Sequence, residues 1–149
     1  MMEAVTVRQT FPHAAEKVWR ITGDFGGLKQ WLPGVTSCTV QGEGARDQGG
    51  DAQRAVQLMD GSIARESLES FDAKKMHYVY AIKEAKGFSP EQQFSARFQV
   101  SPIAPDGCEV IWTARFSVPE DLSQDKIDKA RQRVIQMYQF FLGHLASVL

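Results

Sequence analysis

Arg54 and Glu66 are the charged residues whose placement suggests chemistry. They lie in two strand-like runs on either side of Asp60-Gly61-Ser62, and an Asp-Gly pair between such runs is a strong hairpin signal. A three-residue turn would put both side chains on one face of the hairpin, whereas a two-residue turn would point one of them to water. A buried charge needs a partner, and an arginine beside a glutamate meets that need.

Several roles are open to this pair. It could orient a carbonyl or carboxylate of a ligand, and Glu66 could act as a general acid or base in an enzyme. It could equally be a structural ion pair or a pair at the rim of a cavity. Tyr78 and Tyr80 alternate in a later strand-like run. Their hydroxyls could meet a polar group of a ligand, or they could be tied to the backbone inside a core.

Large apolar side chains are expected on the same face as these polar groups. Residues two apart in a strand share a face, and the runs 94–100 and 110–116 alternate large apolar with polar residues. Aromatic residues and methionine at such spacing either line a pocket or simply form a core, and the pattern fits both. The remaining candidates for ligand contact are Phe25, Trp31, Leu68, Phe98, Trp112, Met137, Tyr138 and Phe141.

Metal and cofactor sites are not predicted. The three histidines are isolated in sequence, and no pair has the helical spacing of a zinc site. The segment from Gly42 to Asp51 begins Gly-Glu-Gly, but it lacks the third glycine and the following helix of a dinucleotide-binding loop. We interpret it as a strand connection that could gate a pocket.

The elements that must position these residues follow a simple order: one strand, two short helices, six further strands and a long helix. Because short turns join the later strands, the sheet should be antiparallel. The predicted fold class is α+β, in one domain of residues 1–149. The predicted ranges are strand 3–11, helices 13–22 and 24–30, strands 35–42, 52–58, 63–71, 76–83, 93–100 and 109–118, and a helix after Ser123.

The C-terminal helix should be the main cover of the sheet. Ser123 is a good N-cap, and Asp125 in the first turn suits the helix dipole. Residues 125–133 should include a solvated face, and the second half should be buried on more than one side. One helix is narrower than a seven-stranded sheet, so space remains for a core or a pocket. The apolar face predicted to be buried comprises Ile127, Ala130, Val134, Met137, Tyr138, Phe141, Leu145 and Val148.

Composition narrows the range of partners. A formal net charge of -1 gives no basic field that would attract nucleic acid. No stretch approaches the roughly 18 apolar residues of a membrane span, and the first residues do not look like a signal peptide. We therefore expect a cytoplasmic protein without stable membrane insertion. Cys38 and Cys108 are expected to be buried free thiols.

Local sequence features carry a family resemblance along nearly the whole chain. They are Val18-Trp19, Asp24-Phe25, Trp31-Leu32-Pro33-Gly34-Val35, Gly42-Glu43-Gly44, Asp60-Gly61-Ser62, Glu66-Ser67-Leu68-Glu69-Ser70 with Asp72, and Trp112 with Phe116. With this order of elements, the chain resembles the START-related superfamily, in its bacterial polyketide cyclase and lipid-transport branch (SRPBCC). The resemblance implies a helix-grip fold, in which a curved antiparallel sheet of about seven strands holds the long helix across its concave face.

Three functions remain open on these grounds. The first is binding of a small hydrophobic molecule, such as a lipid, a polyketide-like compound or an aromatic metabolite, between sheet and helix. The second is a cyclase or dehydratase that uses the same cavity with Glu66 as acid or base. The third is an interaction module whose loops close on ligand and contact an unknown protein partner.

Overall fold

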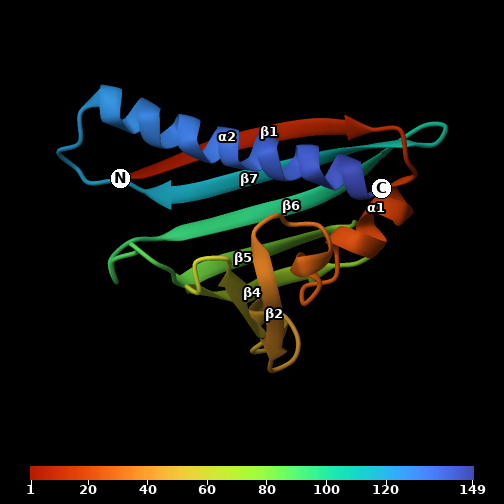
Figure 1. Ribbon diagram of the computed structural model, residues 1–149, viewed down its shortest axis with the longest axis horizontal. Coiled ribbons are helices and arrows are strands. Elements are labelled where there is room, and N and C mark those ends of the chain that lie inside the picture. Colours follow the sequence, from red (N-terminus) through yellow and green to blue (C-terminus); the bar gives the residue numbers. More distant parts are fainter.

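The computed structural model describes residues 1–149, and seven antiparallel strands form one sheet that carries a long helix (Figure 1). The strands lie in the order β1-β7-β6-β5-β4-β3-β2. Consecutive strands from β2 to β7 are therefore neighbours in the sheet, and β7 also pairs with β1. The elements are β1 (Met2–Phe11), α1 (Ala15–Thr22), η1 (Leu28–Gln30), β2 (Val35–Gln41), η2 (Arg46–Gln48), β3 (Gln53–Leu58), β4 (Ile63–Asp72), β5 (His77–Glu84), β6 (Phe94–Ile103), β7 (Gly107–Ser117) and α2 (Gln124–Val148).

This architecture confirms the predicted α+β fold class and the order of its elements. The clearest difference is the length of the last hairpin, in which β6 continues through Pro102 to Ile103. Pro102 pairs with Cys108 of β7, whereas the pairing of β5 with β6 reaches only Gln99. The missing amide of Pro102 therefore faces a side without a neighbouring strand, where no ladder hydrogen bond is required.

The helix α2 begins where the sequence predicts. The Ser123 hydroxyl accepts a hydrogen bond from the backbone amide of Lys126 at 3.4 Å. Further along, Arg131 Nη1 donates to Glu3 Oε1 at 3.1 Å and to the Ala4 carbonyl at 2.7 Å. These bonds fix one side of α2 to β1, and Figure 1 shows α2 running along β1 and β7.

Burial along α2 differs from the prediction. Ile127, Tyr138 and Leu145 are buried as expected, but Met137 is 39% exposed and Val148 is 40% exposed. The second half of the helix is also open to solvent on one side, where Phe140 is 65% exposed. The sheet covers only one side of α2, and successive residues are about 100° apart, so Met137 lies well away from the buried Tyr138.

The remaining expectations concern cysteines and the membrane. Both cysteines are free thiols; Cys108 is buried, whereas Cys38 is only half-buried. Neither helix combines the length and the apolar character needed to cross a membrane.

Candidate functional site

The hairpin between β3 and β4 places Arg54 opposite Glu66. The Leu58 amide donates to the Ser62 carbonyl at 2.9 Å, which leaves three residues in the turn, and Asp60 Oδ1 accepts from the Ser62 amide at 2.9 Å. In the resulting register Arg54 pairs directly with Glu66. Both side chains are buried, at 2% and 11% exposure. The shared inward face is thus confirmed, and the turn has three residues as expected, but they are Met59 to Gly61 and not Asp60 to Ser62.

The ion pair uses only one oxygen of Glu66. Arg54 Nε and Nη2 each lie 2.7 Å from Glu66 Oε1. The third guanidinium nitrogen, Nη1, donates to the Phe25 carbonyl at 3.1 Å. Glu66 Oε2 makes neither of these contacts and is not one of the buried atoms without a partner, so it is an acceptor that solvent or a ligand can reach.

Aromatic rings enclose the guanidinium group. Arg54 Cζ lies 4.4 Å from the ring centre of Phe25 and 4.9 Å from that of Tyr80, and the ring of Tyr78 lies at 5.9 Å. Burial alone would lower the pKa of Arg54, but Glu66 and the two tyrosines raise it by more, and the net pKa is raised. Arg54 therefore stays charged, and cation–π contacts add to the ion pair.

Beside this pair lies a group of tyrosine and tryptophan side chains. Trp112 Nε1 donates to the Tyr80 hydroxyl at 3.3 Å. The rings of Trp112 and Tyr138 stack with centres 3.9 Å apart and planes 9° apart. Trp31 packs 5.8 Å from Trp112 and 5.5 Å from Phe98. These contacts join η1, β6, β7 and α2 through one aromatic cluster.

Two polar atoms of this cluster are buried without a partner. They are the Tyr138 hydroxyl and Trp31 Nε1, and each residue is 1% exposed. The Tyr138 hydroxyl interacts electrostatically with Tyr80 beside it, but the two hydroxyls do not have the geometry of a hydrogen bond. Burial raises the pKa of Tyr138, and Tyr80 and the Glu66 carboxylate raise it further. Tyr138 therefore keeps its proton and is an unused donor near Glu66.

The structure brings most of the predicted site residues together. Phe25, Tyr78 and Tyr80 surround Arg54, and Leu68 is buried opposite Tyr80 on the adjacent strand. The aromatic cluster contains Trp31, Phe98, Trp112 and Tyr138, with Phe141 at its edge, 6.0 Å from Trp112. Met137 lies outside this group on the exposed side of α2.

One partner in the site has no sequence signature. The Phe25 backbone carbonyl accepts from Arg54, and the Cys38 thiol lies 3.9 Å from the same oxygen. Every residue has a carbonyl, so no pattern marks the one that meets a charged side chain 29 residues away.

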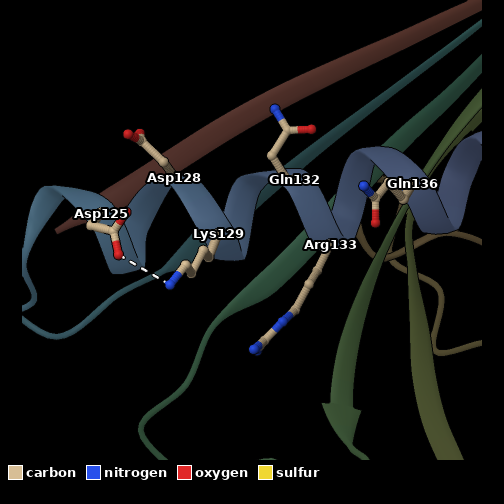
Figure 2. A pocket seen from close by; sticks show the side chains of 6 residues that line it. All are labelled: Asp125, Asp128, Lys129, Gln132, Arg133 and Gln136. Carbon is tan, nitrogen blue, oxygen red and sulfur yellow. Dashed lines mark ion pairs between the residues drawn. The ribbon is translucent and has the colours of Figure 1, made fainter.

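Four of the five principal hollows of the molecule lie elsewhere, and the fifth, of about 250 Å³ over β2, β3 and β4, includes Arg54 in its lining. Figure 2 shows one of about 370 Å³ on the outer side of α2, where the charged and amide side chains include the Asp125–Lys129 ion pair at 3.1 Å. It belongs to the solvated face predicted for residues 125–133. Another hollow, of about 290 Å³, is partly apolar and lies between α2 and the ends of β6 and β7, lined by Phe94, Phe116, Leu122 and Val134 among others.

The interior aromatic residues thus pack on one another and line none of these five hollows. The sequence left both a core and a pocket possible between the wide sheet and the single helix, and these contacts favour the core. The rings of Trp31, Phe98, Trp112 and Tyr138 occupy part of that space.

Two other features bear on cofactors and gating. No group of three or more His, Cys, Asp or Glu side chains is arranged to hold a metal ion. The loop from Gly42 to Asp51 is closed by reciprocal hydrogen bonds: the Asp51 amide donates to the Glu43 carbonyl at 3.0 Å, and the Glu43 amide donates to Asp51 Oδ1 at 3.0 Å. That this loop gates a pocket stays a prediction.

Comparison with known proteins agrees with the observed fold. Residues 2–149 match the family described as polyketide cyclase / dehydrase and lipid transport. The chain belongs to this family. A search of curated proteins found no match to this chain.

Solved structures share its fold. An uncharacterized protein from Bacillus thuringiensis is 25% identical, with a TM-score of 0.76 and 97% of each chain covered. The protein XoxI from Bacillus cereus is 23% identical, with a TM-score of 0.71 over 97% of this chain and 91% of that one. A START superfamily protein from Mycobacterium smegmatis is 17% identical, with a TM-score of 0.65 over 97% and 92%. These likenesses establish the helix-grip architecture, and the family is one of hydrophobic-ligand binding or cyclase-type activity.

Proposed function

We propose that this protein binds a small hydrophobic molecule, of the lipid, polyketide-like or aromatic type, between the concave face of the sheet and α2. The observation that carries this proposal is the presence of two buried polar atoms without partners, the Tyr138 hydroxyl and Trp31 Nε1, in the aromatic cluster beside the ion pair. Buried polar groups in proteins nearly always have partners. The polar end of a bound molecule would supply them, and the surrounding rings would contact its apolar part.

Binding at this place requires the aromatic rings to separate. Arg131 holds one side of α2 to β1. Met137 projects about 120° around the helix from Arg131 and is 39% exposed. The side of α2 away from β1 is therefore the less restrained one, and it already presents apolar surface to an incoming ligand.

An enzymatic role is the second candidate, and one observation favours it. A carboxylate with a free oxygen lies near a phenol that keeps its proton, so Glu66 could accept a proton while Tyr138 donates one. A cyclase or dehydratase needs little more than this and a cavity that folds its substrate. In such an enzyme Glu66→Gln removes turnover, whereas a binding protein has no turnover to lose.

The test of the binding proposal is native mass spectrometry of freshly purified protein, followed by extraction of any small molecule released on denaturation. A panel of lipids and aromatic compounds is then screened by thermal shift. We expect a co-purifying hydrophobic compound or a concentration-dependent rise in Tm with at least one class. No bound compound in repeated preparations, together with no shift across the panel, would contradict the proposal.

A further inference from the structure

The charge at the buried pair is already balanced. Arg54 is the one cation that pairs with Glu66, and both its Nε and its Nη2 are occupied by that carboxylate, while Nη1 is occupied by the Phe25 carbonyl. An incoming carboxylate would have to share guanidinium nitrogens that already have partners. It would also meet the negative charge of Glu66 in a site of low dielectric, where such repulsion is strong.

The other ionisable groups that face the pair are neutral. They are Tyr78, Tyr80, Tyr138 and the Cys38 thiol, and burial raises the pKa of each. None supplies a positive charge that would compensate a bound anion. The site as a whole therefore carries no net charge.

The free hydrogen-bonding atoms of Glu66 and Tyr138 determine which ligand group can pair with both. Glu66 Oε2 can only accept, whereas the Tyr138 hydroxyl can donate or accept. A hydroxyl group on a ligand can donate to the first and accept from the second. A carboxylate cannot donate, and a ketone leaves Glu66 Oε2 unpaired.

We propose that the site selects uncharged hydrophobic molecules that end in a hydroxyl, above all aryl alcohols, and rejects carboxylates of the same shape. This selectivity rests on the proposed binding function. The aromatic preference follows from the neighbouring rings of Trp112, Tyr138, Trp31 and Phe98, which offer flat faces and edges to an aryl group.

Isothermal titration calorimetry of the full-length protein with 2-naphthol and 2-naphthoate at neutral pH tests this selectivity. The two probes share a ring system, but the first is neutral and the second is ionised. Because the naphthol hydroxyl can donate a hydrogen bond to the charged Glu66 carboxylate and the naphthoate cannot, we expect the naphthol to bind at least about tenfold more tightly. Equal affinities, or tighter binding of the naphthoate, would overturn the inference while leaving the proposed function in place. Failure of both probes to bind would overturn the inference and count against the function as well.

A charge substitution adds a second, directional test. In Glu66→Gln the guanidinium of Arg54 loses its counter-charge, so we expect the preference to reverse in favour of the naphthoate. Glu69→Gln is the matched control, since Glu69 pairs with Arg46 and Lys83 outside the site. It should keep the preference of the wild type. If folded Glu66→Gln keeps the preference of the wild type, or if the Glu69→Gln control reverses it equally, the proposed role of the Glu66 charge is contradicted. If Glu66→Gln does not fold, the comparison of the two probes on the wild-type protein decides the question.

Discussion

Replacing Tyr138 by phenylalanine should stabilise the unliganded protein. The hydroxyl is buried and has no hydrogen-bond partner, while the ring stacks on Trp112 at 3.9 Å. Tyr138→Phe removes the unpaired group and keeps the stacked ring. A buried unsatisfied polar group costs about 1–3 kcal/mol, so the free energy of unfolding should rise by about that amount. For a chain of this size each kcal/mol raises Tm by about 2–4 °C.

As a matched control, Tyr80→Phe should change the free energy of unfolding in the opposite direction. The Tyr80 hydroxyl accepts the hydrogen bond of Trp112 Nε1, so its removal leaves a buried donor unpaired and should destabilise the protein by about 1–3 kcal/mol. Urea unfolding followed by tryptophan fluorescence and circular dichroism measures both variants. If Tyr138→Phe is as destabilising as Tyr80→Phe, the Tyr138 hydroxyl has a partner in solution and the reasoning about an unused donor is refuted.

Three further predictions concern the pair, the helix cap and one histidine. Arg54→Met leaves Glu66 buried and unpaired, so denaturant unfolding should show that the free energy of unfolding falls by about 3–5 kcal/mol. The double variant Arg54→Met with Glu66→Leu should recover most of this loss. If the losses of the two substitutions simply add, the two side chains are not energetically coupled. Ser123→Ala removes the cap of α2 and should cost about 1 kcal/mol in the same assay, and an unchanged stability would show that the cap is not formed. Burial and the nearby Arg97 lower the pKa of His77, so its ring should titrate below about 6.5 in an NMR pH series. The folded state then binds fewer protons than the unfolded state, so the contribution of His77 to the free energy of unfolding is complete above about pH 6.5 and decreases as the pH falls below that value. His77→Gln should remove this pH dependence. A titration midpoint above 6.5 would show that the pKa is raised and would contradict the prediction.

Much of the site follows from local rules. The Asp60-Gly61 turn signal and the two-residue period of strands together predict that Arg54 and Glu66 share a face, although the observed turn begins one residue earlier, at Met59. The start of α2 follows from the side chain of Ser123, because a capping hydroxyl acts on the next turn. Such features depend on residues close together in sequence, so the sequence alone predicts them.

The rest depends on three-dimensional distances. The pattern puts Trp112 and Tyr138 on facing surfaces, but whether they enclose a cavity or stack at 3.9 Å depends on how closely α2 approaches the sheet. The exposure of Met137 has the same cause, because a helix covered on one side buries a narrower stripe than its apolar pattern suggests. The continuation of β6 through Pro102 required knowing where β5 ends.

NMR of the three tryptophan indole N–H groups, at Trp19, Trp31 and Trp112, tests the place of binding most directly during titration with 2-naphthol. The account predicts saturable shifts of the Trp31 and Trp112 signals, which lie in the aromatic cluster beside Glu66, with a much smaller change at Trp19 on α1. Shifts confined to Trp19, or to the backbone amides of Phe94 and Phe116 at the surface hollow, would contradict binding between the sheet and α2.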